Sequence, residues 1–222
     1  MSQKHTQPAD IEKTSMAMIE TELQEMGILL PKETAAVVKR VIHTTADFEY
    51  VETLYFSEDV VRKVIAEMGK KTVIVTDTNM AKAGINKVAL QRLNGEIHCF
   101  MADADVAEKA KENGSTRAVA SMEKAAELYP KAIFAVGNAP TALLKLCDLM
   151  ENGFRPALVI GVPVGFVNVV ESKEKMIETC EKYGVPVIAA RGRKGGSNVA
   201  VAICNALLYQ ASDMLDPVAR GW

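Results

Sequence analysis

The sequence predicts an α/β protein in which helices cover both faces of a parallel sheet. From residue 72 onward, five short apolar runs rich in β-branched residues alternate with segments of helical periodicity. The runs are almost continuously apolar, which is typical of strands that are buried on both faces. Alternation of strands and helices favours right-handed parallel crossovers, and therefore a three-layer α/β/α sandwich.

The part of the chain before residue 72 is expected to form helices. Apolar residues recur at helical spacing over residues 10–26, and Gly27 is a suitable stop. A second helix is expected from Pro31, which suits a first helical position, to the neighbourhood of His43. A third is expected from Ser57, a good N-cap, to Met68. These helices form an N-terminal extension of the sandwich.

The predicted strands span residues 72–76, 97–101, 132–136, 157–161 and 186–190. The predicted helices span residues 80–93, 104–112 with 115–128, 140–152, 168–183 and 195–212. A five-stranded parallel sheet with this pattern suits the flavodoxin-like strand order 2-1-3-4-5. The chain contains no linker, repeat or low-complexity segment. We therefore expect a disordered tail over residues 1–9, a single domain over residues 10–212 and a C-terminal tail over residues 213–222.

The composition argues against several classes of protein. A formal net charge of −2 gives no overall attraction for nucleic acid or anionic membranes. No apolar run approaches the ~20 residues of a membrane span. The N-terminus MSQKHTQPAD lacks a hydrophobic signal region, so a cytoplasmic protein is expected. The four cysteines are far apart and form no CxxC pair, which favours buried thiols over zinc ligands or disulfides.

His43 is the first candidate for chemistry. It lies where a strongly helical run gives way to Thr44, Thr45, Ala46 and Asp47, which compete with a helix for backbone hydrogen bonds. The helix should therefore end close to His43. The partial negative charge of a helix C-terminus raises the pKa of a nearby His and prepares it to give a proton. Helix capping alone would also explain a His at this position.

Further candidates follow the predicted strands, because ligands of open parallel sheets bind beyond the carboxyl ends of the strands. Asp77 follows the first strand and Asn138 the third, although capping and turn formation explain each of them taken alone. VIGVPVGF brackets Val164 with glycine and proline, which suits close backbone approach to a large flat ligand. RGRKGGSN combines three cations with glycines at a helix start, which predicts a site for a carboxylate or a phosphate.

Common catalytic and nucleotide-binding motifs are absent from the sequence. It has no Walker A loop, no GxGxxG, no HExxH and no GxSxG. With 5% aromatic residues, stacking on single-stranded bases is disfavoured. Two classes remain open from the residues alone. One is an enzyme that uses His43 as an acid, and the other is a non-catalytic module that binds flavin mononucleotide or another nucleotide.

The segments RVIHTTAD, TDTNMAKAGI, VGNAPTAL, VIGVPVGFVNVVESKE and ARGRKGGSNVA together resemble the precorrin-8X methylmutase family of cobalamin biosynthesis. The resemblance runs from the first helix to the last. It implies a flavodoxin-like sandwich, a homodimer with active sites near the subunit interface, and no organic cofactor. It also implies an isomerase that moves a methyl group from C-11 to C-12 of the macrocycle. The product is hydrogenobyrinic acid from precorrin-8X, or cobyrinic acid from the cobalt-containing substrate.

The resemblance also implies roles for individual residues. The family's catalytic His matches His43, which is expected to protonate a ring nitrogen and assist a suprafacial 1,5-sigmatropic shift. The family's substrate-contacting Ser matches Ser15. Four further polar residues are expected to bind the substrate: Arg40, Asp77, Arg117 and Arg193. Any cobalt is carried within the substrate, so no metal ligands are expected from the protein. A carrier that hands a corrinoid to the next enzyme is a second alternative without catalysis.

Overall fold

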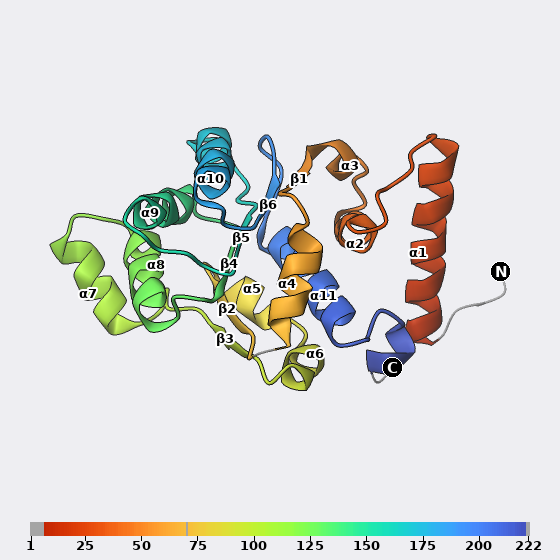
Figure 1. The fold of residues 1–222 in the computed structure, drawn as a ribbon, viewed down its shortest axis with the longest axis horizontal. Helices are drawn as coiled ribbons and strands as arrows, with labels where there is room; N and C mark the ends of the chain where they lie inside the picture. The colour runs from red at the N-terminus through yellow and green to blue at the C-terminus, as the bar shows by residue number, and fades with distance from the viewer. Residues whose placement is uncertain (1–6, 70, 221–222) are drawn as a thin grey trace.

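The computed structural model describes residues 7–69 and 71–220 (Figure 1). Five elements come first: α1 (Pro8–Glu25), α2 (Ala35–Thr45), α3 (Tyr50–Thr53), β1 (Leu54–Phe56) and α4 (Val60–Met68). The alternating part follows with β2 (Val73–Thr76), α5 (Asn79–Gly84), α6 (Lys87–Arg92), β3 (Glu96–His98), α7 (Ala104–Glu112), α8 (Arg117–Leu128), β4 (Ile133–Val136), α9 (Pro140–Glu151), β5 (Leu158–Gly161), α10 (Val169–Tyr183), β6 (Val187–Ala190) and α11 (Ser197–Ala211). A short 3-10 helix, η1 (Pro217–Arg220), comes after α11.

The sheet has the order β1-β6-β5-β4-β2-β3, and all neighbours are parallel except β1 and β6. The five parallel strands are those that the apolar runs predict, and their order is the expected 2-1-3-4-5. The sixth strand, β1, was not predicted. It pairs antiparallel with β6, with Leu54 opposite Ala190. Three residues are too few for a strand periodicity to be recognised in the sequence.

Two hydrophobic cores lie on the two faces of the sheet. Ile133 and Ile160 face the core under α2, α4, α6 and α11, whereas Phe134 and Val159 face the core under α8, α9 and α10. This alternation follows from the two-residue period of a strand. The three-layer α/β/α sandwich is thereby confirmed. Helix α11 packs against α2, α4 and α5, and α1 packs on the outer side of α2 (Figure 1).

Helix α2 differs from its predicted bounds at both ends. Pro31 opens a turn, because its carbonyl accepts hydrogen bonds from the N–H groups of Thr34 and Ala35, and the helix begins only at Ala35. At the other end, the hydroxyls of Thr44 and Thr45 donate to carbonyl oxygens four residues earlier instead of breaking the helix. The helix therefore runs to Thr45, and His43 lies inside its last turn.

Two other predicted boundaries also differ. The helix expected over residues 80–93 is two helices, because Ile85 is extended and the side chain of Asn86 caps α6. Ser57 does not cap α4, whose N-cap is Asp59. Instead, Ser57 exchanges hydrogen bonds with Val187 and prolongs the pairing of β1 with β6.

Both ends of the described chain pack against other elements of the fold. Helix α1 begins at Pro8, inside the expected tail, whereas residues 1–6 of that tail lie outside the described residues. At the other end, η1 contacts α1. All four cysteines are buried and unpaired, as predicted. Within the part of the chain that the structure describes, none of the helices combines the length and apolarity that crossing a membrane requires.

Candidate active site between helices α1 and α2

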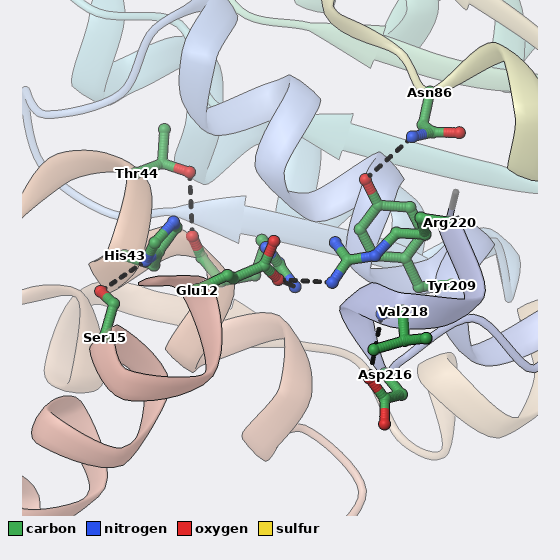
Figure 2. A network of polar contacts seen from close by, with 10 residues as sticks. Glu12, Ser15, His43, Thr44, Asn86, Tyr209, Asp216, Val218 and Arg220 are labelled. Carbon is green, nitrogen blue, oxygen red and sulfur yellow. Dashed lines mark hydrogen bonds and ion pairs between the residues drawn. The ribbon is translucent and has the colours of Figure 1, made fainter. Parts of the chain in front are cut away.

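Ser15 and His43 face each other across the contact between α1 and α2 (Figure 2). Ser15 Oγ lies 2.9 Å from Nδ1 of the half-buried His43 ring. The contact explains why a serine occurs in the middle of α1: its hydroxyl has a partner on the neighbouring helix. The hydrogen bond fixes the orientation of the imidazole and leaves its other nitrogen directed away from Ser15.

Glu12 lies one turn before Ser15 on α1 and joins two arginines. Its Oε1 accepts hydrogen bonds from Arg40 at 2.7 Å and from Arg220 at 2.6 Å. All three side chains are largely buried. Burial alone would raise the pKa of Glu12, but the hydrogen bonds from Arg220 and Arg40 outweigh it and lower the pKa. Glu12 is therefore ionised, and the three groups carry a net charge of +1.

Tyr209 of α11 lies beneath both guanidinium groups. The guanidinium carbon of Arg220 is 4.4 Å from the centre of the Tyr209 ring, and that of Arg40 is 5.2 Å from it. The negative face of an aromatic ring attracts cations at these distances. The hydroxyl of Tyr209 accepts a hydrogen bond from the side chain of Asn86. The cluster therefore receives residues from α1, α2, α11 and η1.

The pKa of His43 is lowered, so the prediction of a raised pKa is wrong. Burial of the ring is the largest cause, and the charge of Arg40 is the next. Glu12 acts in the opposite direction, whereas Arg220 adds to the decrease. With a pKa below the usual 6.5, His43 is mainly neutral at pH 7.

Asp77 lies away from this cluster, at the carboxyl end of β2. Its side chain is buried, and its carboxylate accepts three hydrogen bonds from the backbone N–H groups of Gly137, Asn138 and Ala139, at 2.8–2.9 Å. Burial raises its pKa, and these three bonds oppose the effect. Asp77 therefore fixes the loop after β4, and its carboxylate is not exposed for direct contact with a ligand.

Arg193 and Lys194 lie in the loop between β6 and α11. The Nζ of Lys194 donates to Asp47 and Glu49 at 2.6 and 2.7 Å, which ties this loop to the segment that follows α2. Arg193 is exposed, and its guanidinium lies 5.4 Å from the centre of the Phe166 ring. Arg191 of the same loop is bound to Glu174 and Lys194 to two carboxylates, whereas Arg193 has no carboxylate partner among the described residues.

Lys173 of α10 holds the same loop through hydrogen bonds to its backbone. Its side chain is fully buried, and its Nζ donates to the carbonyl oxygens of Gly192 and Lys194 at 2.8 and 2.7 Å. Gly195 then passes so close to the preceding loop that an added Cβ would lie 2.2 Å from the carbonyl oxygen of Val162. The absence of a side chain at Gly195 thus allows the loop after β6 to pack against the loop after β5.

Arg117 is the first residue of α8 and is exposed. The preceding Thr116 contacts Thr141 of α9, with 3.1 Å between the two hydroxyl oxygens. Helix α8 covers the opposite face of the sheet from α2. Within one chain, the structure therefore brings together Ser15, Arg40 and His43, but it places Arg117 on the other side of the sheet.

Apolar side chains are exposed beyond the carboxyl ends of the strands. Phe166 is 83% exposed and Val167 is 77% exposed, both in the loop after β5, and Met80 is exposed in the first turn of α5. By contrast, a cleft of about 470 Å³ lies at the amino ends of the strands, between Thr72 and Pro186, and does not include His43. Phe166, Val167 and Met80 thus form one of the exposed apolar surfaces, on the side of the sheet where the glycine-rich loops meet.

The family model described as precorrin-8X methylmutase matches residues 10–210. The chain belongs to the precorrin-8X methylmutase family. It is 46% identical over 175 residues to the cobalt-precorrin-8 methylmutase of Salmonella typhimurium, covering 78% of this chain and 80% of that protein. It is 43% identical over 202 residues to the cobalt-precorrin-8 methylmutase of Priestia megaterium, covering 90% and 87%. Methylmutases are isomerases, so the chain is an isomerase.

A solved structure supports the same assignment. The precorrin-8x methyl mutase from Thermus thermophilus superimposes with a TM-score of 0.81 at 38% identity, covering 91% of this chain and 98% of that one. Within the described residues, no three His, Cys, Asp or Glu side chains gather closely enough to hold a metal ion.

The methylmutase resemblance did not indicate three members of the cluster around His43. Glu12 could have been found, because a residue three positions before Ser15 lies on the same face of a helix. Nothing in the sequence singles out Tyr209, because it occupies an ordinary apolar position of α11. Arg220 carries no signal, because it lies beyond the segment that matches the family and its partner Glu12 is 208 positions away.

Proposed function

We propose that this chain is a methylmutase that moves a methyl group from C-11 to C-12 of precorrin-8X or cobalt-precorrin-8. The products are hydrogenobyrinic acid and cobyrinic acid, intermediates of cobalamin biosynthesis. One observation carries the proposal: in a member of this family, His43 is half-buried with Ser15 on one nitrogen and its other nitrogen directed away. A cobalt ion would enter and leave as part of the substrate, and we propose no organic cofactor.

His43 is the proposed proton donor to a ring nitrogen of the macrocycle. The proposed neutral tautomer carries its proton on Nε2, so that Ser15 donates to Nδ1; in the imidazolium, Nδ1 donates to Ser15 instead. A lowered pKa makes the imidazolium a stronger acid but a less populated one. Carboxylates of the bound substrate would favour protonation of His43, because a nearby negative charge raises the pKa of an imidazole. Proton uptake is therefore proposed to accompany substrate binding.

The remaining predicted site residues are proposed to act in two ways. Arg117 and Arg193, which are exposed, pair with the acetate and propionate arms, for which guanidinium groups are well suited. Arg40 is largely buried and bound to Glu12, so it acts on these arms through the positive charge that it places beside His43. Phe166 beside Arg193 offers an apolar surface for the flat macrocycle. Asp77 acts indirectly, since its carboxylate holds the loop after β4.

We further propose that the methylmutase works as a homodimer in the cytoplasm, with its active sites near the interface. Two features support a second copy. Phe166 and Val167 are large apolar side chains left exposed, and exposed apolar patches mark interaction surfaces. In addition, Arg117 lies across the sheet from His43, so a second chain is the simplest way to bring both to one substrate. Light scattering coupled to size-exclusion chromatography tests this, and a monomer at micromolar concentration would refute it.

Turnover of both substrates, followed by visible absorbance, tests the function itself. We expect wild-type protein to convert at least one of them, and His43→Ala to reduce kcat by roughly 10²–10⁴-fold, the usual contribution of general acid catalysis. Parallel titrations with cobyrinic acid and flavin mononucleotide should give corrinoid binding only. A His43→Ala variant with full turnover would defeat the assigned role. Corrinoid binding without turnover by wild-type protein would favour a carrier, and flavin binding alone a nucleotide module.

A further inference from the structure

The C-terminal segment brings one buried cation into the cluster around His43. Arg220 lies in η1, beyond residues 10–210 that match the family, and its side chain is only 2% exposed. Its guanidinium donates to Glu12 and lies over the ring of Tyr209 (Figure 2). A fully buried arginine is rare unless it is paired, because removing the charge from water is costly. This residue is therefore held in place by specific partners.

Two further contacts fasten the same segment. Lys13 of α1 forms an ion pair with Asp216 at 3.0 Å, and Arg92 of α6 donates to the carbonyl oxygen of Ala219 at 3.2 Å. By contrast, Nε of Arg220 has no hydrogen-bond acceptor among the described residues. Leaving a buried donor unpaired is unfavourable. The favourable contacts of the guanidinium among the described residues are therefore those with Glu12 and with the ring of Tyr209.

The charge of Arg220 bears on His43 in two ways. Four groups face the imidazole: Ser15 and Glu12 from α1, Arg40 from α2 and Arg220 from η1. Arg220 shares the oxygen Oε1 of Glu12 with Arg40, so it withdraws part of the negative charge of Glu12 from the site. It also gives Glu12, Arg40 and Arg220 a net charge of +1, whereas Glu12 and Arg40 alone would be neutral.

We propose that Arg220 is a positioning residue of the methylmutase site, whose guanidinium holds Glu12 between two arginines and so sets the charge around His43. The inference rests on the proposed function, since the charge matters to catalysis only if His43 delivers a proton. The direction in which the pKa of His43 should change follows from the charges of this cluster. Removing Arg220 deletes a positive charge and frees Glu12, and both changes raise the pKa of His43.

The test compares the titration of His43 in the wild-type protein and in Arg220→Gln by NMR of the imidazole carbons. His43→Ala assigns the signal. We expect the pKa of His43 to rise by roughly 0.5–1 unit in Arg220→Gln, the range for a charge several ångströms away. Glu12→Gln should shift the pKa in the opposite direction. Lys13→Gln is the matched control, because it removes an exposed cation that fastens the same segment, and it should leave the titration unchanged.

Activity gives a second readout. The pH dependence of kcat should shift with the pKa of His43 in Arg220→Gln, and Arg220→Lys, which keeps the charge, should restore most of the wild-type profile. If Arg220→Gln does not fold, Arg220→Lys and Glu12→Gln carry the test through the titration alone. A His43 titration that is the same in wild-type, Arg220→Gln and Glu12→Gln proteins would overturn the inference. The titration needs no substrate, so it remains decisive even if the proposed methyl transfer fails.

Discussion

The hydroxyl oxygen of Ser15 lies 2.9 Å from Nδ1 of His43 and joins α1 to the last turn of α2. The hydrogen bond orients a ring on which Glu12 acts to raise the pKa, while burial and the charges of Arg40 and Arg220 lower it. Ser15 is therefore placed to determine which nitrogen of His43 carries the proton in the neutral ring. Ser15 therefore acts on the protonation of His43, in addition to making the substrate contact that the family resemblance implies.

Replacing Ser15 by alanine should lower kcat more than it raises KM. A hydrogen bond contributes about 0.5–1.5 kcal/mol, so we expect kcat to fall by roughly 2–10-fold. Steady-state kinetics of Ser15→Ala, with Ser15→Thr as the control that keeps a hydroxyl, measure the effect. A rise in KM at unchanged kcat would show that Ser15 acts only by contacting the substrate.

Replacing Asp77 by asparagine should destabilise the protein. The carboxylate accepts three backbone N–H bonds in a buried position, and an amide would present donor hydrogens to some of them. An unsatisfied buried group costs about 1–3 kcal/mol, and urea unfolding measures this loss. Asp148→Asn is the control, because Asp148 is largely exposed on α9 and should change stability by less than about 0.5 kcal/mol. Equal stability of the two variants would contradict the assigned role of Asp77.

Lys173 should make stability increase with pH in the alkaline range. Burial lowers its pKa in the folded protein to about 8, against 10.5 for the ordinary side chain, while Glu174 acts weakly in the opposite direction. Between these two values Lys173 binds more protons in the unfolded chain than in the folded one, so its contribution to the free energy of unfolding rises with pH. Urea unfolding at pH 8 and pH 10 measures the slope.

Lys173→Met should lose that contribution, whereas Lys175→Met, which replaces an exposed neighbour on α10, should keep it. The same alkaline slope in wild-type and Lys173→Met proteins would mean that Lys173 titrates normally in the folded state.

Phe166→Ala should weaken corrinoid binding by roughly 2–5-fold. The aromatic ring is exposed beside Arg193, and loss of its stacking on the macrocycle is expected to cost about 0.5–1 kcal/mol, in the lower part of the range for aromatic contacts. Fluorescence titration with cobyrinic acid measures the change, with Leu29→Ala as the control because Leu29 is exposed between α1 and α2. The oligomeric state of both variants is measured alongside. Wild-type affinity in a Phe166→Ala protein of unchanged assembly would remove this loop from the substrate site.

The sheet could be predicted because its determinants are local. Four of the parallel strands are largely apolar runs of four residues, and the helices between them dictate crossovers. The fifth, β3, covers Glu96–His98 and overlaps only the first two residues of its predicted run 97–101. Strand β1 could not be predicted, because Leu54–Phe56 forms a strand only by pairing with β6, which lies far along the chain. The division of residues 80–93 into two helices likewise depends on Asn205, which binds the backbone N–H of Asn86.

The candidate site was predicted in part. The family resemblance identified Ser15, Arg40 and His43, and the structure places them together. The protonation of His43 could not be predicted from its position near a helix end. It depends on burial and on the charges of Glu12 and Arg220, which come from opposite ends of the described chain. Long-range contacts of this kind leave no periodic trace in a sequence.

The pairing of Glu12 with Arg220 also has a consequence for synthesis of the protein. Glu12 leaves the ribosome 208 residues before its second arginine partner. Contacts of such high sequence separation form late in folding, because the long intervening chain must first be ordered. The core under α2, α4 and α11 includes α11 and Met214, so it and the charge cluster are both completed only when the end of the described chain has left the ribosome. The core under α8, α9 and α10 has no member beyond Ala189 and can form earlier. The two faces of the sheet are thus expected to be covered at different moments, and His43 gains its full set of charges with the later one.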